Sequence, residues 1–219
     1  RLSGFDLLDQ SGLLAELLPE ITALKGCEQP PEFHPEGDVF VHTRLMLSLL
    51  PEVVSLPLVL SVLFHDLGKP PTMQIDPTGR IRFNGHESIS ATNTESIMRR
   101  LRLSNPEIEA TVEMVKNHMV FKDVQSMRVA RLKRFMARPT FDDELELHRV
   151  DCLGSHGKLD NLDFLAKRRE DFANEPLIPA PLVTGHDLLS LGWKPGPRFK
   201  EALDATQTRQ LDGSLRTRE

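Results

Sequence analysis

The chain has 219 residues, of which 39% are hydrophobic and 27% are charged, close to the composition of ordinary globular proteins. No apolar run approaches the roughly 20 residues that span a bilayer, and no signal-peptide pattern occurs, so a membrane protein is not expected. The formal net charge of −5 argues against a uniformly basic nucleic-acid binder. The two cysteines, Cys27 and Cys152, are too few for a disulfide framework, so we expect a cytoplasmic protein.

The predicted elements are almost all helices, so the expected fold class is all-α, a helical bundle with a small β-hairpin and a C-terminal helical tail. Residues 73–83 contain the turn signal Asp76-Pro77-Thr78-Gly79 between short polar-apolar alternations, which predicts the hairpin. Apolar residues at spacings of three and four predict helices, in chain order, at 5–18, 21–24, 42–50, 58–67, 88–101, 106–118, 129–137, 142–153, 161–172, 185–191 and 199–211.

A proline-rich stretch near the C-terminus predicts a domain boundary. Residues 174–181 contain three prolines in eight residues, which is typical of a stiff linker. We therefore expect a helical domain with an N-terminal helical segment at 1–173, a linker at 174–183 and a helical tail at 184–219. The chain begins with Arg1 rather than Met, which predicts a fragment or a processed chain.

The most informative feature is the pair His65-Asp66, which ends an otherwise apolar helix. Ser55 is the expected N-cap of this helix, Pro57 lies in its first turn and Gly68 is the expected stop. Burying an imidazole and a carboxylate side by side is costly unless a cation binds them, and a divalent metal ion is the simplest candidate. The pair therefore predicts further metal ligands elsewhere in the chain.

Three other histidines and one aspartate are the candidate ligands, and each lies in or beside a predicted helix. For any single one of them, a hydrogen-bonded core residue or a surface residue is the simpler interpretation. Taken together they favour a metal site, because six imidazole and carboxylate groups suffice for two first-row divalent ions bridged by a carboxylate such as Asp66. In chain order the six candidates are His42, His65, Asp66, His86, His118 and Asp151.

This order of histidines and aspartates resembles the HD superfamily of metal-dependent phosphohydrolases. The resemblance implies that residues 1–173 form an HD domain and that all six candidates bind metal in a two-metal site. A one-metal site would use the four-residue core, which is His42, His65, Asp66 and Asp151. The implied cofactors are one or two divalent ions per chain, Ni, Mn, Mg, Fe or Co, and the implied substrate is a nucleotide or another phosphoester.

Lys69 follows the His-Asp pair and has two possible interpretations. Its ammonium would be able to reach an anionic phosphate oxygen held by the metals, which makes Lys69 a candidate catalytic residue together with Asp66. It is equally well explained as a solvated lysine at a helix C-terminus, where a positive charge is favourable to the helix dipole.

The remaining histidines carry weaker signals. His34 is a candidate to border the pocket, and His148 lies three residues before Asp151, so it is a candidate partner of a metal ligand. His156 and His186 are interpreted as structural or surface residues. Cys152 is interpreted as a small buried residue rather than as a metal ligand.

One segment of the chain is strongly basic, since residues 128–138 contain five basic and no acidic side chains. Such a run is most often a solvated helix face, but three of these residues, at spacings of three and seven, share one face of a helix. The run is therefore a candidate RNA-binding stripe for phosphate groups. Its members are Arg128, Arg131, Lys133, Arg134 and Arg138.

Several further motifs extend the resemblance to nearly the whole chain. They are found at residues 26–43, 83–87 (FNGHE), 147–157, 184–188 (TGHDL) and 194–197 (KPGP). These segments resemble the carboxy-terminal half of bacterial CCA-adding tRNA nucleotidyltransferases and their poly(A) polymerase relatives, which place an HD domain after a catalytic head. That head needs a Gly-Ser turn combined with two aspartates one residue apart on a strand, and this combination does not occur here, so we do not expect nucleotide addition by this chain. If the natural protein is longer, the head is expected before Arg1.

Two functional hypotheses follow from these resemblances. In the first, the chain is a metal-dependent phosphohydrolase or phosphodiesterase that acts on nucleotide or RNA phosphoesters. In the second, the chain is a non-catalytic helical body that binds tRNA through the basic stripe and the tail of a CCA-adding enzyme or poly(A) polymerase. The intact ligand set favours the first hypothesis, and the stripe and tail favour the second.

Overall fold

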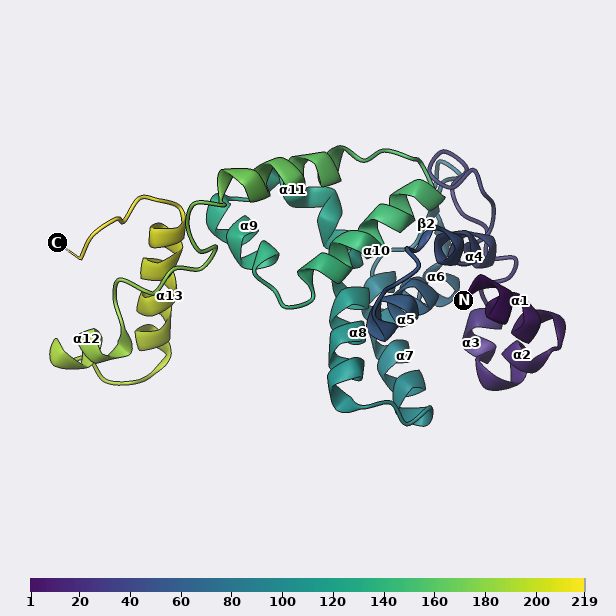
Figure 1. Cartoon of the computed structure of the whole chain (residues 1–219), viewed down its shortest axis with the longest axis horizontal. Coiled ribbons are helices and arrows are strands. Elements are labelled where there is room, and N and C mark those ends of the chain that lie inside the picture. Colours follow the sequence, from purple (N-terminus) through teal and green to yellow (C-terminus); the bar gives the residue numbers. More distant parts are fainter. Residues whose placement is uncertain (219) are drawn as a thin grey trace. The chain divides into compact units, whose positions relative to one another are not determined.

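The computed structural model describes residues 1–218, and its fold is mainly helical with one small hairpin (Figure 1), as the sequence predicted. The chain forms two compact units: residues 1–122 with 142–162 make up unit 1, and residues 123–141 with 163–219 make up unit 2. These bounds differ from the predicted division at residues 173 and 184, which stays a prediction. Among the described residues, no helix is long and apolar enough to cross a membrane.

Unit 1 carries all six candidate ligands, and unit 2 carries the basic stripe. The elements of unit 1 are α1 (Leu2–Gln10), α2 (Leu13–Leu17), α3 (Pro19–Thr22), α4 (Val39–Leu49), α5 (Leu56–Phe64), α6 (Lys69–Thr72), β1 (Gln74–Ile75), β2 (Ile81–Arg82), α7 (His86–Arg100), α8 (Asn105–Asn117) and most of α10 (Phe141–Gly154). The elements of unit 2 are α9 (Val129–Met136), most of α11 (Asp160–Asp171), α12 (Gly185–Ser190) and α13 (Pro197–Leu211). A 3₁₀ helix, η1 (His118–Ser126), lies between α8 and α9 in the chain.

Side-chain caps fix where the ligand-bearing helices α4 and α5 begin. Asp38 caps α4, since its carboxylate accepts a hydrogen bond from the Val41 amide at 2.9 Å. Ser55 caps α5 as predicted, since its hydroxyl accepts a hydrogen bond from the Leu58 amide at 3.1 Å. Such caps satisfy backbone donors that a helix leaves unpaired at its start, and each contributes about 1 kcal/mol.

Several predicted helices begin or end at different residues in the structure, and glycine explains two of these differences. The predicted helix at 5–18 is interrupted, because Gly12 adopts a left-handed conformation with a φ of 77° between α1 and α2. The predicted helix at 88–101 begins earlier, at His86, after Gly85 turns the chain with a φ of 77°. A third helix, α5, ends at Phe64 rather than at residue 67. His86 is therefore the first residue of its helix, which fixes its side chain at one end of α7.

The core of unit 1 lies between α4, α5, α7 and α8. Helix α8 packs against both α5 and α7. Their contacts bury large side chains completely, including Met46, Phe64, Met98 and Met114. Burying such a side chain contributes about 1.5–3 kcal/mol, so this packing holds the helix ends that carry the candidate ligands.

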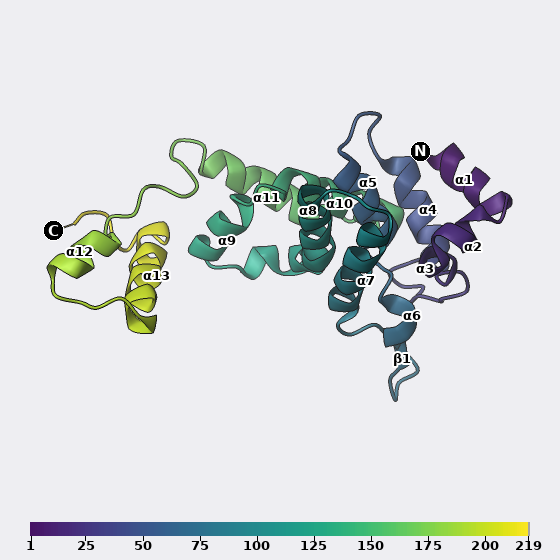
Figure 2. The same cartoon turned by 90° about the horizontal axis from the view of Figure 1, so that it is seen from below.

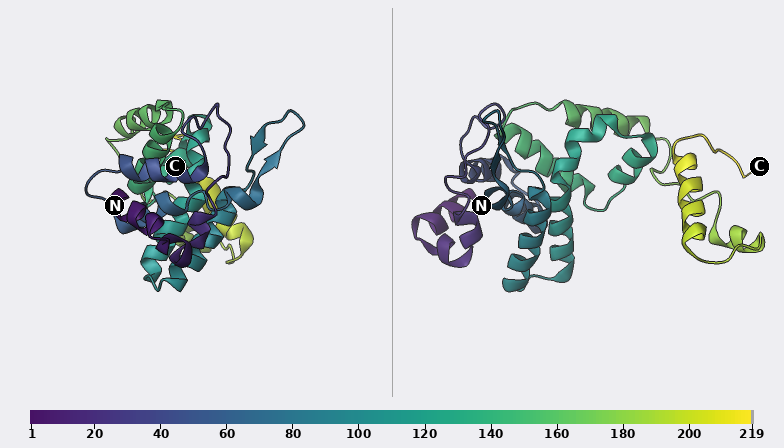
Figure 3. Two further views of the ribbon diagram at one scale, coloured as in Figure 1. Left: turned by 90° about the vertical axis from the view of Figure 1, so that its right-hand side faces the viewer. Right: turned by 180° about the vertical axis from the view of Figure 1, so that it is seen from behind.

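The predicted hairpin is confirmed, and it extends away from the helices of unit 1 beyond α6 (Figures 2 and 3). Strands β1 and β2 pair antiparallel, with Gln74 opposite Arg82. Asp76 stabilises the turn. Its carboxylate accepts a hydrogen bond from the Thr78 amide at 2.9 Å and forms an ion pair with Arg82 at 2.8 Å. Hydrogen bonds from the Thr78 hydroxyl and from Arg82 hold the pKa of Asp76 well below its usual range.

Unit 2 has a smaller core of its own, in which α9 packs against α13. The Ala130 amide donates a hydrogen bond to Asp212 at 2.7 Å, and Leu132 and Leu211 are buried. Helix α12 begins with a capping box, in which Thr184 and Asp187 satisfy each other's backbone amides. Helices α12 and α13 correspond to the predicted helices at 185–191 and 199–211.

Candidate metal centre

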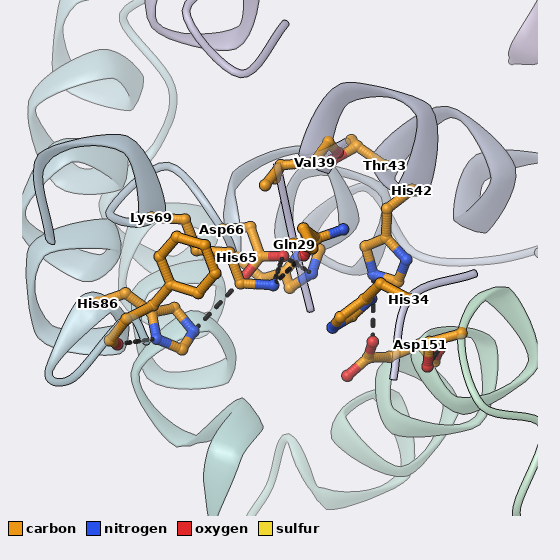
Figure 4. A network of polar contacts seen from close by, with 12 residues as sticks. Gln29, His34, Val39, His42, Thr43, His65, Asp66, Lys69, His86 and Asp151 are labelled. Carbon is orange, nitrogen blue, oxygen red and sulfur yellow. Dashed lines mark hydrogen bonds and ion pairs between the residues drawn. The ribbon is translucent and has the colours of Figure 1, made fainter. Parts of the chain in front are cut away.

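Three of the predicted ligands meet in one group, although they come from three helices. His42 lies on α4, His65 ends α5 and Asp151 lies on α10, and their ligand atoms are all within 4.8 Å of one another. The distance between His42 Nε2 and Asp151 Oδ1 is 3.2 Å (Figure 4). The two histidines are buried. One nitrogen from each ring and one carboxylate oxygen therefore converge, as in a metal site.

The other three predicted ligands form a second group, in which the ligand atoms of Asp66, His86 and His118 are again within 4.8 Å of one another. Asp66 Oδ1 lies 3.4 Å from His86 Nε2 and 4.0 Å from His118 Nε2. The two histidine Nε2 atoms are 3.1 Å apart. All three residues are buried.

Asp66 connects the two groups, because its two carboxylate oxygens face different histidines. Oδ1 faces His86 and His118, whereas Oδ2 lies 3.1 Å from Nε2 of His65 in the first group. A carboxylate in this position offers one oxygen to each group, which is the arrangement of a bridging ligand in a two-metal site.

The histidine tautomers are fixed by hydrogen bonds on the other side of each ring. A backbone carbonyl can only accept, so a ring nitrogen that contacts one carries the hydrogen, and the opposite nitrogen keeps its lone pair. The contacts join Nδ1 of His65 to Val62 O at 3.0 Å, Nδ1 of His86 to Phe83 O at 2.8 Å and Nδ1 of His118 to Val115 O at 2.6 Å. These three rings thus present Nε2 as an electron-pair donor.

The buried nitrogen and oxygen atoms of these residues show whether the site is suitable for a metal ion. Among the described residues, Nε2 of His42, Nε2 of His65 and Oδ2 of Asp66 are buried and make no hydrogen bond of good geometry, and their polar contacts are the ionic ones to Asp151, to Asp66 and to His65 and Lys69, respectively. Buried polar atoms are nearly always satisfied, and leaving one unpaired costs roughly 1–3 kcal/mol. Imidazole nitrogen and carboxylate oxygen are ligands of first-row divalent ions, so these residues fit a divalent metal.

The pKa values of the site residues are shifted in different directions, so some groups are ionised at neutral pH and others are neutral. Burial lowers the pKa of His42, but the Asp151 and Glu36 carboxylates outweigh this effect and raise that pKa to about 9. Burial and the neighbouring histidines lower the pKa of His118 to about 3. Burial opposes ionisation of Asp66, but His65 and Lys69 outweigh it and hold the Asp66 pKa well below its usual range. At neutral pH the site therefore has an ionised carboxylate beside a neutral imidazole.

Glu36 is a site residue that the sequence interpretation missed. Its Oε1 atom lies 2.6 Å from Nδ1 of His42 and 2.9 Å from Nδ1 of His34. The His34 ring packs edge-on against His42, with ring centroids 5.0 Å apart. Glu36 thus orients His42 as the carbonyls orient the other histidines. The available signal was an acidic residue two positions after His34 in a proline-containing loop, which is weak.

Lys69 is buried, so it is not a solvated lysine at a helix C-terminus. It is only 7% exposed, and its ammonium Nζ lies 2.7 Å from Asp66 Oδ2 as an ion pair (Figure 4). The same ammonium donates a hydrogen bond to Gln29 Oε1 at 2.5 Å. Gln29, also buried, is a second residue that the sequence interpretation missed.

Both groups open on a cavity of about 510 Å³ in unit 1, a size typical of small-molecule sites. Besides candidate ligands and Lys69, its wall includes apolar and basic side chains. Among them are Phe33, Arg80, Met119 and Lys122. The Arg80 guanidinium stacks over the Phe33 ring at 5.1 Å, which joins the loop before α4 to the hairpin. The cavity thus presents positive charge near the candidate ligands, as an anionic substrate requires.

The other histidines have distinct positions. His148 is buried and stacks on Phe121, with centroids 4.7 Å apart and an angle of 17° between the rings. Its Nε2 lies 3.6 Å from Sγ of Cys152, a buried thiol whose pKa burial raises to about 12. His156 is exposed and lines the cavity, and His186 is exposed on α12 in unit 2.

The five residues of the predicted RNA-binding stripe are not equally available to a ligand. Arg128, Arg131 and Arg134 are exposed, and Arg134 donates a hydrogen bond to Thr208 at 2.9 Å. The other two are only half-exposed and lie over aromatic rings: Lys133 over Phe172 at 5.0 Å and Arg138 over Phe135 at 4.3 Å. The first three are therefore the accessible part of the stripe.

Two groups of histidine and aspartate on one cavity of a helical fold define a candidate two-metal centre. Comparison with known proteins shows that the chain is similar to tRNA nucleotidyltransferases. The chain is 33% identical to the CC-adding tRNA nucleotidyltransferase of Thermus thermophilus, over 99% of this chain and 50% of the relative. It is 31% identical to the A-adding tRNA nucleotidyltransferase of Deinococcus radiodurans, over 98% of this chain and 51% of the relative. It is 29% identical to the multifunctional CCA protein of Herminiimonas arsenicoxydans, over 94% and 51% respectively.

The chain thus spans about half the length of these curated relatives and is homologous to one half of tRNA nucleotidyltransferases. The predicted resemblance to this family is confirmed to that extent. No protein-family profile matches the chain. The assignment of residues 1–173 to the HD superfamily stays a prediction.

Proposed function

We propose that this chain is a metal-dependent phosphohydrolase of the HD type that hydrolyses nucleotide or RNA phosphoesters. The observation that carries the proposal is the position of Asp66, whose two oxygens face two separate groups of ligands on one cavity. Hydrolases that cleave phosphoesters often use two metal ions, which stabilise both the attacking and the leaving oxygen.

In this proposal, each site residue has a role in binding metal or phosphate. His42, His65 and Asp151 would hold one divalent ion, His86 and His118 the other, and Asp66 would bridge them. Bound divalent ions lower the pKa of water and withdraw charge from phosphate oxygens. Lys69, in the cavity wall, would bind a phosphate oxygen, so it and Asp66 are the proposed catalytic residues. Ni, Mn, Fe and Co suit this set of imidazoles and carboxylates, whereas Mg would bind mainly through the carboxylate oxygens.

The relatives suggest where this activity would be used. They are named tRNA nucleotidyltransferases, and one is named multifunctional. We therefore place the chain in the cytoplasm as part of a tRNA-processing protein, with a phosphoester of tRNA or of a nucleotide as substrate. Nucleotide addition would belong to a head, corresponding to the half of the relatives that this chain does not match.

Hydrolysis assays test the proposal directly. The chain is incubated with Ni²⁺, Mn²⁺, Co²⁺ or Mg²⁺ and with a 2′,3′-cyclic nucleotide or bis-p-nitrophenyl phosphate. We expect metal-dependent hydrolysis that His65→Ala and Asp66→Ala abolish. His186→Ala, which changes an exposed histidine in unit 2, serves as the matched control and should keep full activity. A metal-loaded, folded chain that hydrolyses neither substrate would contradict the proposal.

A second candidate function, a helical body that binds tRNA, is favoured by the exposed arginines Arg128, Arg131 and Arg134. Phosphate contacts make nucleic-acid binding strongly dependent on salt. If tRNA binds here, Arg131→Ala and Arg134→Ala should each reduce the slope of log affinity against log salt by about one unit. Asp66→Ala should leave that slope unchanged. Salt-insensitive binding, or equal slopes in all variants, would exclude the stripe as an RNA site.

A further inference from the structure

Lys69 and Gln29 form a buried polar pair beside Asp66, and the proposed binding of phosphate by Lys69 does not explain this pairing. Both side chains are buried, and the Lys69 ammonium donates a hydrogen bond to the Gln29 amide oxygen at 2.5 Å. The Gln29 amide nitrogen in turn donates to the Gly37 carbonyl at 3.4 Å. Figure 4 shows the ammonium between Gln29 and Asp66. The loop before α4 therefore holds the ammonium at the carboxylate.

The ammonium is placed where a cation would bind. It forms an ion pair with Asp66 Oδ2 at 2.7 Å, the oxygen that also lies 3.1 Å from His65 Nε2. A buried carboxylate without a nearby positive charge is strongly destabilising, so the metal-free site needs a counter-ion. A divalent ion on the same oxygen would be only a few ångströms from the ammonium, and repulsion in this buried site would be strong.

We propose that Lys69 is a resident counter-ion of Asp66, which Gln29 holds in place when metal is absent and which competes with the metal for Oδ2. This inference rests on the proposed function only in requiring that the site binds a divalent ion. When the ion binds, the ammonium moves off Asp66 and becomes available to the phosphate of the substrate. Gln29 suits this role because a neutral amide holds the ammonium without cancelling its charge.

The competition predicts that removing the ammonium tightens metal binding, which is opposite to the usual effect of changing a site residue. Mn²⁺ binding to chelator-treated protein is measured by calorimetry for the parent and for Lys69→Met, which keeps an unbranched apolar side chain. We expect a Kd at least roughly tenfold lower in Lys69→Met, because a buried like charge has been removed. In chelator, the same variant should melt at a lower temperature than the parent, because Asp66 has lost its counter-ion.

Lys25→Met is the matched control, since Lys25 is also paired with an aspartate in unit 1 but is exposed. Its Mn²⁺ affinity should equal that of the parent. A second variant, Gln29→Leu, keeps the ammonium but releases it, and it should tighten Mn²⁺ binding severalfold. In the Lys69→Met background, Gln29→Leu should have no further effect on affinity.

The outcomes separate this inference from the proposed function. If the parent binds no Mn²⁺, the proposed function fails, and with it the basis of this inference. If the parent binds Mn²⁺ but folded Lys69→Met binds it equally or more weakly, the counter-ion role is wrong while the proposed function stands. If Lys69→Met does not fold, Gln29→Leu decides, and an unchanged or weaker affinity in that variant overturns the inference.

Discussion

The Nε2 atoms of His86 and His118 lie 3.1 Å apart, while Nδ1 of each ring contacts a backbone carbonyl. Each ring uses its Nδ1 hydrogen on a backbone carbonyl, so two lone pairs face each other. Burial lowers the pKa of His118 to about 3, so that ring does not take up a proton at neutral pH. A cation held by these two histidines and Asp66 would remove the repulsion between the neutral rings.

This relationship predicts how the number of bound ions changes on mutation. Removing His86 or His118 takes away ligands of the second group only, so each alanine variant should bind one ion where the parent binds two. Asp66→Ala should reduce binding at both positions, because its oxygens face both groups. Elemental analysis of folded, metal-saturated protein gives the stoichiometry. If the His86→Ala and His118→Ala variants bind as many ions as the parent, the second group is not a metal site.

A second prediction concerns the pH dependence of stability without metal. The pKa of His42 is raised in the folded protein to about 9, above its ordinary value near 6.5, by Asp151 and Glu36. Protonation of His42 therefore stabilises the fold fully below about pH 6.5, and this stabilisation is lost as the pH rises through about 9.

In chelator, the melting temperature should fall over that pH range, and His42→Gln should flatten the fall. Scanning calorimetry at constant ionic strength measures both. The parent saturated with metal is the control, because a metal bound at Nε2 keeps the ring neutral and removes this source of pH dependence. A parent whose stability rises over the same range would contradict the prediction.

Gly68 gives a third prediction, which depends on close packing rather than on backbone conformation. A Cβ atom added at Gly68 would lie 2.2 Å from the backbone carbonyl oxygen of His86. Gly68→Ala must therefore displace the start of α7, and it should destabilise the fold by about 2–4 kcal/mol. Because His86 moves with that helix, metal binding by the second group should weaken as well.

Urea denaturation and metal titration measure these two effects. Gly4→Ala is the matched control, since Gly4 lies in α1 and an added Cβ meets no atom within 4 Å. It should be neutral or stabilising by about 0.5–1 kcal/mol, because alanine favours the helix. Equal stabilities of the two variants would show that α7 adjusts without cost.

Glu36 provides a fourth prediction about the orientation of His42. Carboxylates that accept the second ring hydrogen of a metal-binding histidine typically contribute 10–100-fold to metal affinity. Glu36→Ala should therefore weaken metal binding by about that factor while leaving the helical content unchanged. Glu32→Ala, which removes an exposed carboxylate of the same loop, is the control and should bind metal as the parent does. Unchanged affinity in Glu36→Ala would remove Glu36 from the site.

Features that depend only on neighbouring residues could be predicted from the sequence. Helix caps such as Ser55, the hairpin turn at Asp76 and the helical periodicities act over a few positions, so they could be predicted locally. The six candidate ligands were also predicted, because a His-Asp pair at the end of an apolar helix is unusual. The interruption at Gly12 was not, since the leucine spacing continues through a residue whose left-handed conformation ends the helix.

Only the tertiary structure decided which side chains meet across long stretches of sequence. Gln29 and Lys69 are 40 residues apart, and nothing near either residue in the sequence shows that their buried side chains meet beside Asp66. Glu36 is close to His42 in the chain, but its role depends on a loop path that periodicity does not predict. His148 lies against Phe121 because α10 packs there. Such contacts follow from the packing of whole helices, which local sequence signals do not encode.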